Sequence, residues 1–198
     1  ELGLRLGTET FYQYLYAFGL GTKTGIDLPG ESDGLLINRK YVKTVDLARI
    51  GFGQSVTVTP MQMICAACAV INGGRLMRPY LVSEVVAQGG EVLHRNVPKV
   101  ISTPISPETS ATMRELLEAV VSEGGGRNAA IDGYRIGGKT GTAQVYKQGK
   151  IVHDVHIGSF VGFAPADDPK VAVLVIVDEA TLQPDYGGTT AAPFARQI

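Results

Sequence analysis

The chain has 198 residues, 44% of them hydrophobic, and a formal net charge of −1 at pH 7. A chain of this size and composition can bury a sizeable core. Its nearly neutral charge excludes the basic field with which nucleic-acid-binding domains and membrane-surface patches attract phosphates. No apolar run reaches the length of a membrane-spanning helix. We therefore expect a globular domain, or part of one, that does not bind nucleic acid.

The first 44 residues are predicted to form one helix and one long loop. The helix begins at Thr8, a residue type favoured as N-cap, and is closed by Gly19. It is amphipathic and carries three tyrosines, of which we expect one to be packed and two to be exposed: Tyr12, Tyr14 and Tyr16. Residues 19–44 contain repeated glycines and a Pro-Gly pair, which predict a loop.

A second helix is predicted over residues 60–71. Thr59 and Gln62 form the pattern of a capping box, with a proline at the first helical position and Asn-Gly-Gly after the last. Cys65 and Cys68 have the spacing of a redox pair, but they fall in the helix interior, where a disulfide between positions i and i+3 would be strained. We therefore expect them to be buried free thiols.

A strand pair and a third helix are predicted next. The strands cover residues 81–86 and 91–93 and turn at Gly89-Gly90. The helix opens at Ser106-Pro107, carries apolar residues at helical spacing and ends at Gly124-Gly125-Gly126.

The last third of the chain is predicted to form a sheet. Its three strands lie at about residues 134–146, 156–164 and 171–178. The turns between them fall at Gln148-Gly149 and Asp167-Asp168-Pro169. Such short links require antiparallel pairing. A final helix is expected near Thr190. An antiparallel sheet flanked by helices places the chain in the α+β class.

The most informative stretch is Gly137-Gly138-Lys139-Thr140-Gly141-Thr142-Ala143-Gln144. Together with Gly133 it satisfies the phosphate-loop pattern G-x-x-x-x-G-K-[ST] of nucleotide hydrolases. That loop needs a strand before it and a helix after it, so that the helix N-terminus can bind phosphate. Here a poor strand precedes the motif, and a glycine with β-favouring residues follows it, which disfavours the ATPase alternative.

In a strand, successive side chains alternate between the two faces. Thr140, Thr142 and Gln144 would then share one face, where two hydroxyls and an amide can line a cleft. Lys139 and Gly141 would share the other, inner face, where the glycine allows another segment to approach closely. Hydroxyls beside a cation suit a substrate with a carboxylate, and an unpaired N–H of an edge strand could stabilise an oxyanion.

The Lys-Thr-Gly triplet and three longer blocks resemble class B penicillin-binding proteins, the peptidoglycan D,D-transpeptidases with a serine β-lactamase-like fold. The blocks run in the family's order along the chain: Phe18–Glu31, Ile50–Gln62 and Gly158–Ala166. Within the family, the chain is most similar to the division or sporulation enzymes of Gram-positive bacteria. The resemblance implies a partial transpeptidase fold that uses neither a metal nor an organic cofactor.

The family's two other motifs, Ser-x-x-Lys and Ser-x-Asn, do not occur in these residues. In the family both precede the block at which this chain begins. We therefore expect residues 1–198 to be the C-terminal portion of one transpeptidase domain, with the nucleophile in an upstream part of the same protein. Alone, the chain should be unable to form an acyl-enzyme.

The resemblance also implies roles for individual residues. Lys139 would stabilise charge around the serine, and the hydroxyls of Thr140 and Thr142 would bind the carboxylate of a D-Ala-D-Ala stem peptide or of a β-lactam. The N–H of Thr142 would complete an oxyanion hole. Gly141 belongs to the same substrate-binding wall, and Gln144 would line the outer cleft. The catalytic residues expected in this chain are thus Lys139 and Thr142.

The implied partners are stem peptides, β-lactams, the upstream part of the protein and other cell-wall synthesis proteins. The implied location is the extracytoplasmic face of a bacterial membrane, through an anchor outside these residues. A β-lactam sensor or β-lactamase of the same fold, and a non-catalytic wall-synthesis scaffold, stay open as alternatives. His153 and His156 flank the start of the second strand of the sheet, and without a nearby cysteine they are expected to be solvated or at the substrate rim rather than zinc ligands.

Overall fold

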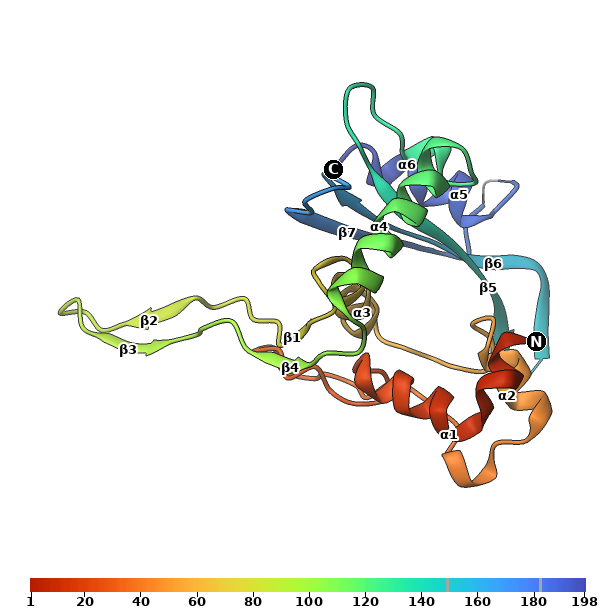
Figure 1. Cartoon of the computed structure of the whole chain (residues 1–198), viewed down its shortest axis with the longest axis horizontal. Coiled ribbons are helices and arrows are strands. Elements are labelled where there is room, and N and C mark those ends of the chain that lie inside the picture. Colours follow the sequence, from red (N-terminus) through yellow and green to blue (C-terminus); the bar gives the residue numbers. More distant parts are fainter. Residues whose placement is uncertain (149, 182) are drawn as a thin grey trace. The chain divides into compact units, whose positions relative to one another are not determined.

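The computed structural model describes residues 1–148, 150–181 and 183–198. They divide into two compact units, one of residues 1–69 and 74–106 and the other of residues 70–73 and 107–198. Helices and antiparallel strands occur in both, so the predicted α+β class is confirmed (Figure 1). Of the predicted turn at Gln148-Gly149, Gly149 lies outside the described residues.

Helix α1 (Leu2–Ala17) opens the first unit and begins six residues before Thr8. It is kinked at Gly7, whose φ of 74° is not helical, so the predicted start at Thr8 marks the second of two merged helices. The helix is closed as predicted by Gly19, which has a φ of 77° and follows the C-cap Phe18. The N–H groups of Gly19 and Leu20 donate to the carbonyls of Tyr16 and Leu15, the bonds of a Schellman motif.

The three tyrosines of α1 are disposed as predicted. Tyr12 is fully buried, and its hydroxyl donates to the carbonyl of Ile37 at 2.7 Å. Tyr14 and Tyr16 are exposed. These tyrosines therefore form no continuous stacking surface.

The long loop after α1 contains more structure than predicted. A 3-10 turn, η1 (Arg39–Tyr41), lies within the predicted loop, and helix α2 (Thr44–Ile50) begins at its last residue. The seven-residue helix α2 starts where the Asp46 carboxylate accepts from the N–H of Lys43 at 3.0 Å, and it buries Leu47 and Ile50. A helix this short leaves little periodicity to detect, which is why the sequence pattern missed it.

Helix α3 (Pro60–Ile71) has the predicted capping box. The N–H of Gln62 donates to the Thr59 hydroxyl at 3.1 Å, and the N–H of Thr59 donates to the Gln62 side-chain oxygen at 2.8 Å. The buried amide of Gln62 also donates to the carbonyls of Thr22 and Asp33. The Gln62 side chain thus caps α3 and also hydrogen-bonds to two residues of the preceding loop.

The strands of the first unit form two small ribbons. β1 (Leu76–Met77) pairs with β4 (Val100–Ser102), and β2 (Glu84–Val86) pairs with β3 (Val92–Arg95), both antiparallel. The β2–β3 hairpin extends away from the β1–β4 ribbon (Figure 1). Its first strand is shorter than predicted, because the N–H groups of Leu81 and Val82 donate to the Asp27 carboxylate instead of joining the ladder.

The second unit contains α4 (Pro107–Ser122), η2 (Arg127–Ala129) and a three-stranded antiparallel sheet in the order β5-β6-β7. The strands are β5 (Gly137–Lys147), β6 (Lys150–Ala164) and β7 (Val171–Asp178). β7 has the predicted bounds. β6 begins six residues earlier than predicted, so His153 and His156 lie inside it, because its hairpin with β5 continues past a register shift at Gln144/Val145.

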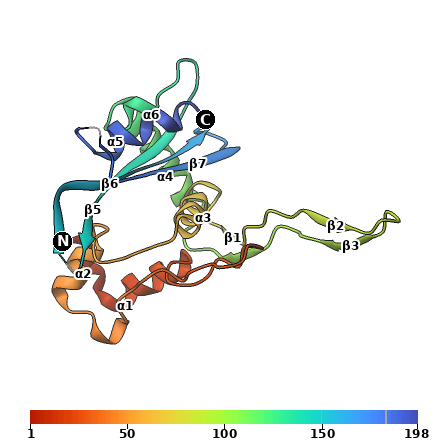
Figure 2. The same cartoon turned by 180° about the vertical axis from the view of Figure 1, so that it is seen from behind.

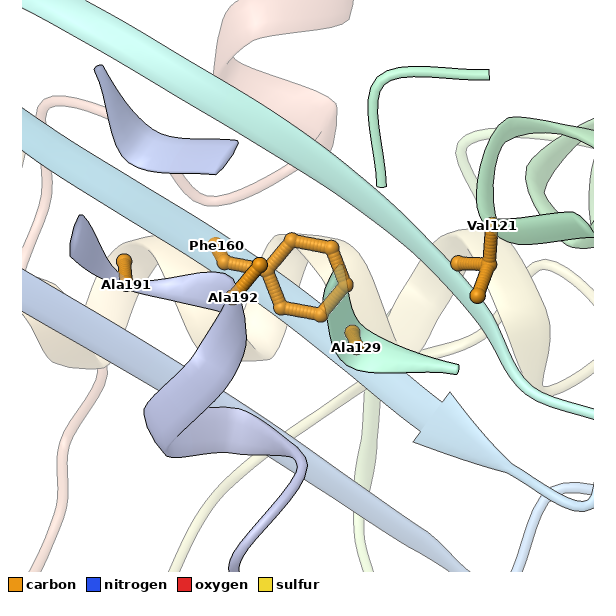
Figure 3. Close-up of a cluster of buried hydrophobic side chains, with 5 residues drawn as sticks. All are labelled: Val121, Ala129, Phe160, Ala191 and Ala192. Carbon is orange, nitrogen blue, oxygen red and sulfur yellow. The ribbon is translucent and has the colours of Figure 1, made fainter. Parts of the chain in front are cut away.

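Two short helices end the chain, α5 (Gly187–Thr190) and α6 (Ala192–Ala195). They lie against the sheet (Figure 2), where a single helix was predicted near Thr190. Their alanines Ala191 and Ala192 pack with Val121, Ala129 and Phe160 in one buried cluster. Figure 3 shows the Phe160 ring among these side chains.

Phe163 anchors a second cluster with Ile71 and Ala166. Because Phe160 and Phe163 are three positions apart on β6, they lie on opposite faces of the sheet. A Cβ on Gly138 would come within 2.4 Å of the Phe160 ring, and one on Gly137 within 2.2 Å of the Phe163 ring. Gly137 and Gly138 therefore allow one phenyl ring to pack against the backbone of β5 on each face, immediately before Lys139.

Candidate functional site: the Lys-Thr-Gly strand

All five predicted site residues lie on β5, which is an edge strand among the residues that the structure describes. Thr140, Thr142 and Gln144 pair with Phe160, Gly158 and His156 of β6. Directly opposed residues of an antiparallel pair point to the same face, so the predicted grouping of these three side chains on one face is confirmed.

Lys139 lies on the other face of β5, opposite Val161. Its side chain is exposed, and its Nζ donates to the carbonyl of Thr140 at 2.7 Å. Among the residues that the structure describes, no carboxylate lies within ion-pair distance of this ammonium. The charge is therefore free to interact with groups that approach this edge.

Gly141 is a point of close approach on both faces of the strand. A Cβ on Gly141 would lie 2.5 Å from the hydroxyl of Ser159, its partner on β6. On the opposite face, a Cβ on Gly187 would lie 2.3 Å from the Gly141 carbonyl oxygen and 2.2 Å from that of Ser159. The expected need for glycine at position 141 is thus explained by Ser159, and the first residue of α5 must also be glycine.

Thr142 is exposed, yet its hydroxyl has a fixed neighbour. The backbone N–H of Gly187 donates to Thr142 Oγ1 at 3.3 Å. Gly187 itself is buried, and Gly158, which pairs with Thr142, is covered by Thr190 and Gly187. The hydroxyl of Thr142 therefore accepts a hydrogen bond on the side of α5 and is exposed on its other side.

Gln144 faces His156 across the hairpin, and His156 is bound to Asp185. The ring Nδ1 of His156 lies 2.9 Å from both carboxylate oxygens of Asp185, whose side chain is only 4% exposed. A carboxylate can only accept, so Nδ1 carries the hydrogen. Burial opposes the charge of Asp185, but the hydrogen bond and the attraction of His156 outweigh it and lower the pKa of this carboxyl.

The structure excludes a phosphate loop at this motif. Lys139 and Thr140 lie inside β5, and the strand continues to Lys147, where a nucleotide hydrolase needs a helix. Gly133 belongs to a turn before the strand. The ATPase alternative is therefore wrong.

One other prediction about this chain also has an outcome. Cys65 and Cys68 are free thiols as predicted, but they are half-buried rather than buried, and this partial burial raises the pKa of Cys65 to about 11. In the part of the chain that the structure describes, no three histidine, cysteine or acidic side chains gather as metal ligands would.

Comparison with known proteins defines the class. Residues 1–198 match the family model of the penicillin-binding protein transpeptidase domain. The chain therefore belongs to this family.

Individual relatives agree with that assignment. The chain is 48% identical over 199 residues to the stage V sporulation protein D of Bacillus subtilis, and 36% identical over 207 residues to the penicillin-binding protein PbpB of Mycolicibacterium smegmatis. Both matches cover the whole chain, but only 31% and 32% of the relatives. The chain thus spans about a third of the length of these proteins.

Solved structures share the fold. The crystal structure of penicillin-binding protein 3 from Mycobacterium tuberculosis, complexed with ampicillin, superposes with a TM-score of 0.91 at 33% identity. The match covers 99% of this chain and 45% of that one. The transpeptidase domain of penicillin-binding protein 3 from Burkholderia pseudomallei gives 0.84 at 30% identity, covering 98% and 56%. The predicted transpeptidase-like α+β fold is confirmed.

None of the helices in the described ranges combines the length and apolar character needed to cross a bilayer.

Three residues at this site were not predicted to act together: His156, Asp185 and Gly187. His156 was placed only at a rim, and its partner lies 29 positions away. The only local feature of the sequence that could have indicated this contact is the Gly187-Gly188 pair, since consecutive glycines allow the backbone of another segment to approach closely. Nothing in the sequence pairs those glycines with Thr142.

Proposed function

We propose that residues 1–198 are the C-terminal portion of one transpeptidase domain and supply the Lys-Thr-Gly wall of its active site. The complete protein would be a peptidoglycan D,D-transpeptidase that works through a serine acyl-enzyme, with the nucleophile and general base outside these residues. The observation that carries the proposal is strand β5, an edge strand within the described residues, which presents an exposed Lys139 and an exposed Thr142. The family membership of the whole chain supports it.

In the proposed reaction, the serine oxygen attacks the carbonyl between the two D-alanines of a stem peptide. The tetrahedral oxyanion accepts hydrogen bonds from the N–H of Thr142 and from that of the serine. The terminal D-alanine leaves with a proton, and the amine of a neighbouring stem then attacks the acyl-enzyme, which forms the cross-link and releases the serine. A β-lactam would acylate the same serine.

The proposed roles follow the positions on β5. The charge of Lys139 stabilises the ionised forms of the nucleophile and its base. The hydroxyls of Thr140 and Thr142 donate to the substrate carboxylate, and Gly141, on the opposite face of the strand, leaves room for the Ser159 hydroxyl. Gln144 lines the outer cleft. Charge-assisted hydrogen bonds to a carboxylate are the strong ones, so this wall would select ligands that carry one.

Names of relatives support the substrate class. A 32% identical protein of Neisseria meningitidis is called a probable peptidoglycan D,D-transpeptidase, and the mycobacterial structure holds ampicillin. We further propose that the complete protein acts in a division or sporulation machine at the extracytoplasmic face of the membrane. It would be held there by an anchor outside residues 1–198 and would work with other wall-synthesis proteins.

The test is the rate of acylation by a fluorescent penicillin, measured on the complete protein. Lys139→Ala should lower that rate by about two to three orders of magnitude while leaving thermal unfolding unchanged, since it removes electrostatic stabilisation at the reacting centre. Lys150→Ala, an exposed lysine on β6 of the same sheet, is the control and should acylate normally. Unimpaired acylation of the Lys139 variant refutes its role. A wild-type protein that is never labelled favours a non-catalytic scaffold.

A further inference from the structure

We propose that Asp185 and His156 are positioning residues, which hold Gly187 so that its N–H fixes the direction in which the Thr142 hydroxyl donates. This inference rests on the proposed function, in which Thr142 binds the carboxylate of the substrate. His156 lies in the middle of β6 and Asp185 in the segment before α5, and neither touches the substrate in that function.

The first step concerns the hydrogen of the hydroxyl. A threonine hydroxyl has one hydrogen to donate and two lone pairs to accept with. The N–H of Gly187 occupies one lone pair of Thr142 Oγ1 at 3.3 Å. The O–H bond therefore cannot point at Gly187 and can donate toward the open side of β5. A substrate carboxylate, which only accepts, then meets a hydroxyl already oriented to donate.

The second step concerns how Gly187 reaches this position. Its Cα lies so close to the sheet that a Cβ would stand 2.2 Å from the Ser159 carbonyl oxygen and 2.3 Å from that of Gly141. Gly158, the pairing partner of Thr142, is equally close to α5, since its Cβ would lie 2.3 Å from the Thr190 hydroxyl. Only residues without a side chain allow the N–H to approach Thr142.

The third step concerns what keeps Gly187 there. The segment before α5 is fastened to β6 by the bond between Asp185 and His156 Nδ1. Asp185 is buried, and His156 is three-quarters buried, with Tyr186 stacked obliquely at a ring-centroid distance of 6.0 Å. Only Tyr186 separates Asp185 from Gly187, so a displacement of the Asp185 carboxylate also moves the N–H of Gly187. His156 also pairs with Gln144 across the hairpin, so the bond between Asp185 and His156 is adjacent to the residue proposed to line the outer cleft.

The test compares two ligands that differ only in the carboxylate, benzylpenicillin and its methyl ester, on the complete protein. The measured quantity is the ratio of their second-order acylation rate constants. The wild type should prefer the acid, and Asp185→Ala should reduce this preference by about tenfold, the effect of weakening one hydrogen bond to a charged group. The ester rate should change much less.

Two further variants separate positioning from general damage. Asp185→Asn keeps an oxygen that accepts from His156 Nδ1, so it should retain most of the wild-type preference. Asp154 is an exposed acidic residue on β6, the strand that carries His156. Asp154→Asn should leave the acylation rates of both ligands unchanged. A partly unfolded variant lowers the acid and ester rates together and leaves their ratio intact, so loss of folding does not imitate the predicted result.

The variant Thr142→Val separates a failure of the positioning role of Asp185 from a failure of the proposed role of Thr142. If it abolishes the preference for the acid while Asp185→Ala keeps the wild-type ratio, the positioning role is wrong and the role of Thr142 stands. If the wild type shows no preference, or Thr142→Val keeps it, the proposed function of Thr142 is wrong and the inference falls with it.

Discussion

The ring of Phe160 lies against the backbone of Gly138, so that a Cβ on this glycine would stand 2.4 Å from the ring's Cζ. Phe160 is 1% exposed and is the largest member of its cluster. The residue after this contact is Lys139, so the packing of one core ring fixes the strand where the candidate site begins.

Gly138→Ala should therefore destabilise the fold by about 1–3 kcal/mol, the usual cost of overpacking a core. Chemical denaturation measures this loss. Gly125→Ala is a suitable control, because a Cβ at Gly125 meets nothing within 4 Å. Combining Gly138→Ala with Phe160→Leu should cost less than the sum of the two single changes, since a smaller side chain relieves the contact with the ring and leaves only that with the Val161 carbonyl oxygen at 2.7 Å. Simple additivity would contradict the account.

Among the polar residues of the first unit, substitution of Gln62 should lower the free energy of unfolding most. Gln62 is 1% exposed, and its side chain makes three hydrogen bonds, to Thr59, Thr22 and Asp33. Gln62→Met keeps the volume but removes all three, so we expect a loss of about 3 kcal/mol at roughly 1 kcal/mol per bond. Gln13→Met, at an exposed position of α1, is the control. A loss no larger than that of the control would show that the amide does not hold the loop.

Glu31 should make stability depend on pH. Its carboxylate accepts from the N–H groups of Thr24 and Gly25 at 2.7 and 3.0 Å. Burial raises the pKa of Glu31, but these bonds and the Thr24 hydroxyl bring it below the ordinary 4.5. Because the folded value is the lower one, ionised Glu31 stabilises the fold above pH 4.5, and this contribution is lost as the pH falls through the folded pKa.

Glu31→Gln should thus be less stable than the wild type at neutral pH, and the difference should shrink below pH 4.5. Urea unfolding over this range measures it, with the exposed Glu91→Gln as control. A difference that stays constant with pH would mean that the charge of Glu31 contributes nothing.

The thiols of α3 should be unreactive in the folded protein. Burial, with smaller contributions from Cys68 and Glu31, raises the pKa of Cys65 to about 11, and the thiolate is the reactive form. Alkylation should be about a hundredfold slower in the folded than in the urea-unfolded protein. Equal rates, or a disulfide found between Cys65 and Cys68, would contradict the structure.

Local patterns predicted the elements whose signals lie close together in the sequence. The capping box at Thr59 and Gln62, the glycine end of α1 at Gly19 and the full extent of β7 are examples. The alternation of β5 likewise predicted that Thr140 and Thr142 share a face. In each case the residues that decide the structure lie within a few positions of one another.

Other features depend on partners distant in sequence. The pairing of β1 with β4 joins Leu76 to Ser102, and the early start of β6 depends on a register shift near Gln144. The Asp185–His156 bond spans 29 positions, and the Gly187–Thr142 bond spans 45. No periodicity encodes such contacts, so the surroundings of the candidate site could not be predicted although its strand was.

The most direct test of the central claim is to locate the penicilloyl adduct in the complete protein by peptide mass spectrometry after labelling with penicillin. The claim that this chain supplies one wall of an active site predicts an adduct on a serine outside residues 1–198. An adduct on any residue within 1–198 would show that the nucleophile has been misplaced, and the absence of any adduct would contradict a serine transpeptidase.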